Sequence, residues 1–354
     1  MRLSVIIANW NYREFVGAAI TSALAVDWAD KEVIVVDDAS TDGSRAVIES
    51  FAGKITAFFR PKSHQLGAHM FGFEQSTGDV VIFLDADDLL EPEVMEEVAK
   101  AWVPGVSKVQ YRMNLIDAAG VQLGTGFPQF PAKGDPASLR RIFLSRMAYT
   151  TPPGTGNAYS RQFVRQAFAM APVGLPASDT VLVTLAPILG DVVTIRKPLA
   201  RYRIHGANYA ALGSLEPDKL HRRLQEDVLT ARLFATALRR LRLPVPADPL
   251  RRCPSHLQYR LASYLVEPAA HPFPEDSLPR LLYRLLLSSI GYSEMRLRDR
   301  AILLVWGFAC SLSPRRYRRR FVLWRFAPTS RPAIVRTLLA ALSSLRSIRL
   351  PNRA

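Results

Sequence analysis

Cysteine and long apolar runs are both scarce in this 354-residue chain. Its two cysteines, Cys253 and Cys310, provide neither a disulfide framework nor a metal-ligand spacing, so the sequence predicts a reducing compartment. The longest apolar run, residues 301–310, is far shorter than the roughly 18–20 residues that span a bilayer, so no transmembrane helix is expected. No basic-then-apolar leader precedes the first apolar segment, so no signal peptide is expected either.

Acidic residues are absent from Arg300 to the end of the sequence, a stretch that carries twelve arginines. Residues 1–210 hold 20 Lys and Arg against 21 Asp and Glu, whereas residues 211–354 hold 26 against 10. The net charge of +15 therefore belongs to the C-terminal part of the chain. Such a balance ordinarily suggests nucleic acid. In residues 315–326, however, arginines alternate with large apolar side chains, which favours a helix on anionic lipid, and we expect no nucleic-acid partner. The alternative is a solvated basic face on an ordinary helical bundle.

Apolar segments of strand length alternate with helical patterns through the first hundred residues, which is typical of a largely parallel α/β sheet. We expect strands at residues 3–8, 32–36, 55–59 and 79–84, and helices at residues 13–25, 43–52 and 67–76. A second α/β stretch extends to about residue 205. After residue 213 the pattern becomes helical, with Leu220, Leu224, Val228 and Leu233 on one face, and further helices are expected at residues 279–290, 295–312 and 333–347. The predicted domains are an α/β domain at 1–210 and an all-α basic module at 211–354.

Three carboxylates follow the fourth expected strand directly: Asp85, Asp87 and Asp88. Like charges packed this closely repel one another, and burying them without a partner is costly. Oxygen ligands of this kind suit a hard divalent ion, Mg²⁺ or Mn²⁺, held by one or two carboxylates together with substrate phosphates. The alternative is a solvated acidic turn that caps the next helix.

Polar residues also follow the first two expected strands. Asp37 and Asp38 end the second strand, and Ser40 or Thr41 can cap the helix that comes next, a role that needs neither aspartate. The first strand ends in the cluster Asn9-Trp10-Asn11-Tyr12. Ligands of open α/β sheets lie beyond the carboxyl ends of the strands. The three strand ends therefore predict a pocket for a nucleotide diphosphate, with an aromatic platform, sugar- or base-binding carboxylates and a metal site.

Three sequence blocks, residues 4–11, 35–44 and 78–88, resemble the inverting family 2 glycosyltransferases of GT-A fold in order and spacing. The resemblance extends more weakly through Ser178-Asp179 and residues 202–208. It implies a GT-A domain, Rossmann-like with a mixed sheet, that uses Mn²⁺ or Mg²⁺. It also implies transfer of a sugar from a UDP- or dTDP-sugar to a hydroxyl of a glycan or lipid-linked acceptor, in the synthesis of cell-surface polysaccharide.

The resemblance assigns roles to individual residues. Asp179 matches the family's catalytic base, although Ser178 replaces the usual preceding glutamate. The metal ligands are expected to be Asp87, Asp85 and His205, and the role of Asp88 is left open. The nucleotide-binding residues are expected to be Ala8, Trp10, Asp37, Asp38, Asp85 and Arg203. The family's Gly-Ala-Arg-Asn segment reads Gly67-Ala68-His69-Met70 here, so the arginine and the asparagine are missing.

Two functions of other classes are consistent with the same residues. One is a metal-dependent phosphohydrolase acting on sugar phosphates, because Asp85-Ala86-Asp87 also resembles an aspartate nucleophile motif. The other is a non-catalytic scaffold that binds membrane or RNA through its basic tail. For a glycosyltransferase, we expect a cytoplasmic location, peripheral on the inner face of the cell membrane. Residues 152–157 are expected to form a loop on the acceptor side.

Overall fold

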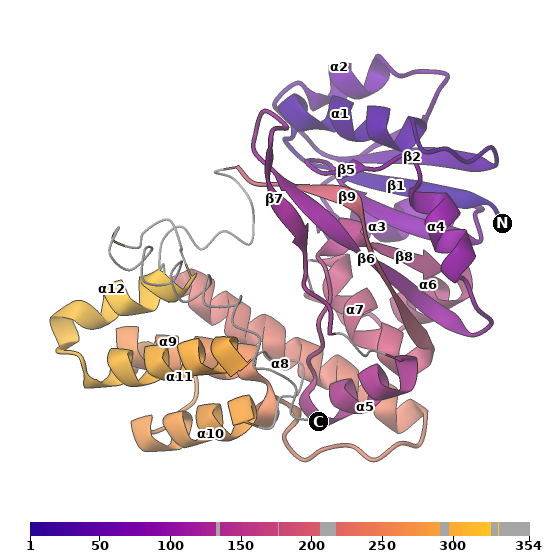
Figure 1. The fold of residues 1–354 in the computed structure, drawn as a ribbon. Helices are drawn as coiled ribbons and strands as arrows, with labels where there is room; N and C mark the ends of the chain where they lie inside the picture. Colours follow the sequence, from indigo (N-terminus) through magenta and orange to yellow (C-terminus); the bar gives the residue numbers. More distant parts are fainter. Residues whose placement is uncertain (132–134, 176, 206–216, 291–296, 327–331, 333–354) are drawn as a thin grey trace, which may run out of the picture. The chain divides into compact units, whose positions relative to one another are not determined.

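The computed structural model describes the chain except residues 132–134, 176, 206–216, 291–296, 327–331 and 333–354 (Figure 1). It forms two compact units. Unit 1 contains Met1–His205 and Gln225–Cys253, and unit 2 contains Gly206–Leu224 and Pro254–Ala354. The chain therefore leaves unit 1 and returns to it before it ends in unit 2.

Among the described residues, unit 1 is built on a nine-stranded mixed sheet of order β3-β2-β1-β4-β8-β6-β9-β5, with β7 paired to β6 (Figure 1). The strands are β1 (Leu3–Asn9), β2 (Lys31–Asp38), β3 (Thr56–Arg60), β4 (Val80–Asp85), β5 (Leu89–Leu90), β6 (Val106–Ile116), β7 (Gln122–Phe127), β8 (Asn157–Ser160) and β9 (Asp191–Arg203). Strands β3, β2, β1 and β4 run parallel, whereas β8 pairs antiparallel with β4. The parallel part explains the near-continuous apolar runs, because helices cover both of its faces.

Side chains that alternate along β1 enter two separate hydrophobic clusters. Leu3, Val5 and Ile7 pack in the cluster that also contains buried residues of α1 (Arg13–Leu24), α2 (Ser44–Glu49) and α4 (Val94–Ala101). Ile6 packs in the cluster on the other face. That cluster includes buried residues of α3 (His64–Gln75), α5 (Pro136–Arg146), α6 (Arg161–Phe168), α7 (Ser178–Leu189) and the second half of α8 (Pro217–Arg240). The sheet is therefore the middle layer of three.

The four strands expected in the first hundred residues are confirmed, with ends that differ by one or two residues. The fold class is confirmed as well, since a mixed sheet between helices is followed by helices alone. The helix expected at residues 333–347 lies outside the described residues. Within the described ranges, no helix is long and apolar enough to cross a membrane.

Unit 2 is helical. Its helices are the start of α8 together with α9 (Pro254–Val266), α10 (Leu278–Ile290), α11 (Leu297–Leu312) and α12 (Arg315–Phe326). Short 3-10 helices lie at Pro249–Arg252 in unit 1 and Pro268–Ala270 in unit 2. Leu261, Leu285 and Leu303 form a common core with Val322 of α12. The indole of Trp306 on α11 donates a hydrogen bond of 3.0 Å to the carbonyl oxygen of Phe321. Helix α12 is thus anchored, although it is rich in arginine.

The apolar stripe expected along α8 is divided between the two units. Leu220 packs in the core of unit 2, whereas Leu233 and Phe234 pack against the helices of unit 1. Residues 225–253, which follow the boundary expected at residue 210, lie in unit 1, and the domain boundary itself stays a prediction. The periodicity of a helix shows which side is buried, but not which neighbour buries it.

Candidate active site

The carboxyl ends of β1, β2 and β4 lie side by side. The register of the parallel pairs places Asn9 beside Asp37 and Ala8 beside Asp85. This is the edge of an open sheet where ligands bind. The polar residues that end or follow these three strands are therefore close together in space.

Asp37 is engaged in a network that fixes the loop after β2. Its Oδ1 accepts hydrogen bonds from Asn9 Nδ2 at 2.7 Å and Ser40 Oγ at 2.6 Å. Its Oδ2 accepts from the backbone N–H of Ser40 at 3.0 Å. Asp37 is also buried. These contacts hold the loop after β2 in place. Nucleotide binding by Asp37 stays a prediction.

Asp38 lies beside the exposed aromatic platform. Its Oδ1 accepts from Ser63, through the backbone N–H at 2.5 Å and the hydroxyl at 2.8 Å. Its Oδ2 forms an ion pair of 3.1 Å with Lys62 Nζ. The same ammonium lies over the ring of Trp10, which is 50% exposed. Trp10 and Asp38, both expected at a base site, therefore adjoin one another through Lys62, a residue that the sequence analysis missed.

The acidic turn after β4 is buried. Asp85 Oδ1 accepts from Gln65 Nε2 at 2.9 Å, and Asp88 Oδ1 accepts from the backbone N–H of Arg203 at 2.9 Å. Burial, followed by the negative charges of Asp87 and Asp179, raises the pKa of Asp85 to about 8. Burial and the charges of Asp85 and Asp87 raise the pKa of Asp88 well above its usual range. Ionisation of the Asp85 and Asp88 carboxyl groups is therefore unfavourable in this site.

A divalent cation fits this turn. Asp88 Oδ2 is buried and has no hydrogen-bond partner in the part of the chain that the structure describes. Nearby positive charge favours ionised carboxylates. Among the described residues, no group of three or more His, Cys, Asp or Glu side chains is arranged to hold a metal ion by itself. Such a turn suits Mg²⁺ or Mn²⁺, which a few carboxylates hold together with substrate phosphates.

His205 and Arg203, at and beyond the end of β9, contact the same turn. His205 Nε2 lies 2.9 Å from Asp87 Oδ2, and its ring packs on Phe15. The buried guanidinium of Arg203 donates to the carbonyl oxygens of Asp87 at 2.7 Å and Ala118 at 2.9 Å. His205 is therefore placed beside the expected metal ligand. Arg203 ties the turn to the segment after β6, and phosphate binding by its guanidinium stays a prediction.

Asp179 lies in the first turn of α7 and faces the acidic turn across a small cavity. Its Oδ1 accepts from the backbone N–H of Thr180 at 2.7 Å. Asp85 and Asp179 both line this cavity, whose volume is about 10 Å³, and they share it with Gln65, His69, Phe83, Gly154, Tyr159, Ser178 and Leu182. The expected base and an expected nucleotide-binding carboxylate therefore converge from different elements.

The loop at residues 152–157 closes one side of this cavity. Thr155 Oγ1 lies 3.1 Å from the backbone N–H of Asp85 and accepts its hydrogen bond. A Cβ atom on Gly154 would lie 3.1 Å from Asp85 Oδ2, so a side chain at this position would displace the Asp85 carboxylate by a few tenths of an ångström. The glycines and prolines of this segment were its only sequence signal.

Residues 4–116 match the family model described as glycosyl transferase family 2. An uncharacterised glycosyltransferase from Nostoc sp. is 36% identical over 215 residues, which are 59% of this chain and 66% of that protein. The chain thus spans somewhat under two thirds of that relative.

Two solved structures have a similar fold. TarS from S. aureus in complex with UDP-GlcNAc has a TM-score of 0.54 at 15% identity, covering 92% of this chain and 91% of that chain. The mannosyltransferase PcManGT from Pyrobaculum calidifontis, with GDP-Man and Mn²⁺, has a TM-score of 0.50 at 17% identity, covering 91% and 85%. The fold is that of GT-A transferases, and residues 4–116 of the chain carry a glycosyl transferase family 2 domain.

Proposed function

We propose that this chain is a metal-dependent, inverting glycosyltransferase. It moves a sugar from a nucleotide-diphosphate donor to a hydroxyl of a glycan or lipid-linked acceptor, in cell-surface polysaccharide synthesis. The observation that carries the proposal is the convergence of Asp85 and Asp179 on one cavity, beside a buried acidic turn at the carboxyl ends of parallel strands. The match of residues 4–116 to glycosyl transferase family 2 supports the reaction class.

Asp179 is the base in this proposal. The acceptor oxygen forms a bond to the anomeric carbon on one face of the sugar while the bond from that carbon to the phosphate oxygen breaks on the other. The electron pair leaves with the nucleoside diphosphate, and the acceptor proton passes to the carboxylate of Asp179. The bond from Thr180 N–H to Asp179 Oδ1 fixes the carboxylate for this transfer.

Asp87, Asp85 and His205 are the residues that would hold Mn²⁺ or Mg²⁺, and His205 Nε2 lies 2.9 Å from Asp87 Oδ2. A bound divalent ion supplies positive charge that stabilises the departing diphosphate. The acidic turn matches this need because its carboxylates are costly to ionise without a cation. Arg203 keeps the turn in place through hydrogen bonds to its backbone.

Trp10 and Asp38 form the base side of the donor site in this proposal. An exposed indole offers a stacking surface, and the buried carboxylate beside it accepts hydrogen bonds from a base edge. We propose UDP- or dTDP-sugars as donors. TarS, which resembles the chain in fold, was solved with UDP-GlcNAc, but PcManGT was solved with GDP-Man, so guanine belongs in the test.

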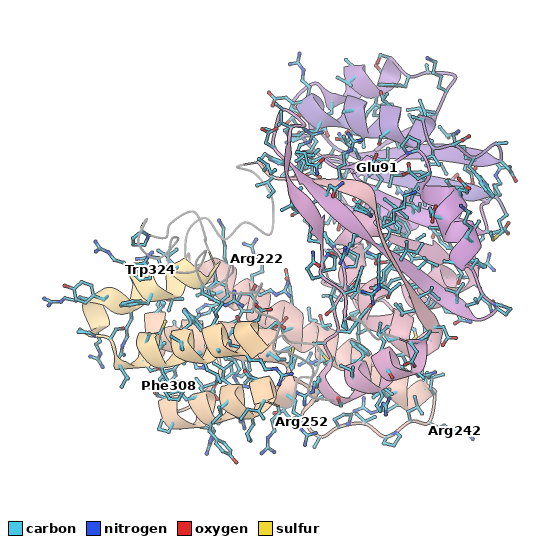
Figure 2. All side chains as sticks on the ribbon, viewed as in Figure 1. Glu91, Arg222, Arg242, Arg252, Phe308 and Trp324 are labelled. Carbon is cyan, nitrogen blue, oxygen red and sulfur yellow. The ribbon has the colours of Figure 1, made fainter. Side chains whose placement is uncertain are left out.

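We also propose that unit 2 contacts an anionic membrane surface, on the cytoplasmic side. Helix α10 exposes Tyr283, Leu287 and Ile290 at helical spacing. Helix α11 does the same with Val305, Phe308 and Leu312, and Figure 2 marks Phe308. Helix α12 exposes Arg315, Arg316 and Arg320. Apolar stripes combined with arginines suit a lipid interface better than a purely solvated face.

A donor screen tests the proposed function. Thermal shifts are measured with UDP-, dTDP- and GDP-sugars, each with and without Mn²⁺, and the best donor is then incubated with glycan and lipid-linked acceptors. We expect a Mn²⁺-dependent shift followed by release of nucleoside diphosphate and formation of a glycoside. Release of inorganic phosphate from sugar phosphates would instead indicate the phosphohydrolase. Absence of any metal-dependent nucleotide binding would indicate a scaffold.

A further inference from the structure

Two buried polar side chains beside the Asp85–Asp179 cavity have unsatisfied atoms. His69, on α3, is 2% exposed, and Tyr159, on β8, is 1% exposed. Among the described residues, neither His69 Nε2 nor the Tyr159 hydroxyl has a hydrogen-bond partner. Both residues line the same cavity. Buried polar atoms are nearly always hydrogen-bonded, so two exceptions at one cavity require an explanation.

His69 is held in place by neighbours that leave Nε2 for the cavity. Its Nδ1 lies 2.6 Å from Ser178 Oγ, and its ring packs on Phe83 at a centroid distance of 4.6 Å. Burial lowers the pKa of His69 to about 3, so the imidazole is neutral near pH 7. A neutral ring with Nδ1 on a hydroxyl presents Nε2 as either a donor or an acceptor, according to the tautomer.

The size of the cavity limits what these atoms can bind. About 10 Å³ is the space of a single water-sized group. A phosphate is too large, and a neutral imidazole and a phenol attract it less than an arginine would. A hydroxyl both donates and accepts, so it satisfies Nε2 and the phenol together, and sugars and glycan acceptors are rich in hydroxyls.

We propose that His69 and Tyr159 form a subsite for one substrate hydroxyl, next to Asp85 and Asp179. The inference rests on the proposed glycosyltransferase function and deepens it. The subsite would distinguish substrates by the presence and orientation of one hydroxyl group. The hydroxyl comes either from the transferred sugar or from the acceptor. A site built to hydrogen-bond a hydroxyl discriminates strongly against a substrate that lacks it.

The variant that tests the subsite is Tyr159→Phe, which removes one oxygen and keeps the ring. The matched control is Tyr149→Phe, a buried tyrosine of the same cluster whose hydroxyl donates to the carbonyl oxygen of Val183 at 3.0 Å. Without ligand, Tyr159→Phe should keep or raise Tm, by up to about 2–4 °C, because an unsatisfied hydroxyl is lost. Tyr149→Phe should lower Tm.

Calorimetry with Mn²⁺ then compares UDP with UDP-GlcNAc, UDP-glucose and UDP-galactose, or the GDP and dTDP equivalents if the wild type prefers them. We expect Tyr159→Phe to bind the nucleoside diphosphate normally. If the hydroxyl belongs to the donor sugar, the nucleotide sugar binds about 5–10-fold more weakly, the weight of one neutral hydrogen bond. If it belongs to the acceptor, donor affinity is unchanged and the KM for acceptor rises by a similar factor. His69→Gln is a second variant, and it should change the same quantity as Tyr159→Phe, either donor affinity or the KM for acceptor.

Unchanged donor affinity and acceptor KM in both variants would overturn the subsite and leave an ordered water as the occupant. Equal weakening of nucleoside diphosphate and nucleotide sugar would also overturn it, because that pattern indicates a general change in the fold. A wild type that binds no nucleotide would refute the proposed function itself, whereas a wild type that binds and a Tyr159→Phe variant that is unaffected refute only the subsite.

Discussion

The Lys62 ammonium lies 3.4 Å from the centre of the Trp10 ring. It also pairs with the buried carboxylate of Asp38 at 3.1 Å. The cation thus rests on the ring face where we propose that a base stacks, so a nucleotide has to move it. The two residues come from the ends of different strands, β1 and β3, and only the fold brings them together.

Trp10→Ala should weaken nucleotide binding by about 5–100-fold, since stacking of a base on an aromatic ring is worth about 1–3 kcal/mol. Trp10→Phe should retain most of the affinity. Nucleotide should change the intrinsic fluorescence of the wild type as the ammonium leaves the indole, and this change should be lost in Trp10→Phe. Equal affinities of Trp10→Ala and wild type, by calorimetry, would place the base elsewhere.

Asp87→Asn should abolish metal-dependent nucleotide binding, because an amide cannot balance a divalent cation and a diphosphate. The control is Asp27→Asn, which removes an exposed carboxylate. Calorimetric titration of UDP with and without Mn²⁺ gives the comparison. Undiminished Mn²⁺-dependent binding in Asp87→Asn would count decisively against the assigned metal site.

Asp179→Asn should leave nucleotide affinity nearly unchanged and reduce kcat by roughly 10²–10⁴-fold, the range for loss of a general base. The amide keeps a carbonyl oxygen that can still accept from Thr180 N–H, so the start of α7 should stay folded. Near-normal turnover, or a collapse of Tm, would show instead that Asp179 serves the helix and that the base lies elsewhere.

We expect unit 2 to lose stability as the pH falls, because the carboxyl group of Asp276 becomes protonated. Burial alone would raise the pKa of this carboxyl, but the hydrogen bonds from His271 and Arg260, with the charge of Arg260, outweigh burial and hold the pKa below its usual range. A depressed pKa stabilises the fold above the unfolded value of about 4, and this stabilisation is lost as pH falls through the folded pKa. Arg260 donates hydrogen bonds of 2.7 Å to the Asp276 carboxylate from both Nε and Nη2.

Asp276→Asn should therefore lower the free energy of unfolding by about 3–5 kcal/mol near neutral pH, as expected when one partner of a buried pair is removed. Thermal denaturation from pH 7 to pH 3 should show the difference from the wild type shrinking below about pH 4. A difference that is constant over this range would show that the charge of Asp276 is not the source of the stability.

Replacing Arg315, Arg316 and Arg320 of α12 with glutamine should weaken flotation with anionic vesicles, since each basic residue near such a surface contributes about 1 kcal/mol. The matched control replaces three exposed arginines of unit 1: Arg239, Arg240 and Arg242 (Figure 2 labels Arg242). Salt near 1 M should weaken wild-type binding, because the Debye length falls to about 3 Å.

Leu287→Ser with Leu312→Ser should weaken the binding that remains at high salt, because apolar insertion is not screened. Point substitutions are preferable to truncation before Arg300, since that cut removes Leu303, Trp306 and Cys310 from the core of unit 2. If wild-type protein ignores anionic vesicles at low salt, the membrane proposal fails and the helices serve packing or oligomerisation.

The sequence predicts the strands and the acidic turn well, because each is a local pattern: an apolar run and the residues that follow it. It does not separate Asp37 from Asp38, since the pleat and the loop after β2 decide that Asp37 bonds to Asn9 and Ser40 while Asp38 lies beside Trp10. Lys62 and Tyr159 leave no sequence signal, and His69 stands out only as a departure from the family's Gly-Ala-Arg-Asn segment. Their significance comes from partners more than twenty residues away or from the lack of a partner.

The division of α8 between the two units limits how the chain can be cut. Residues 225–253 supply Leu233, Phe234 and Leu238 to the core of unit 1, while residues on both sides of that segment belong to unit 2. A fragment that ends at residue 210 would leave the matching surfaces of α5 and α7 bare and prone to aggregation. No single cut in the chain separates the two units. An exchange of the helical unit must therefore keep residues 225–253 with unit 1, and it needs two junctions in the chain.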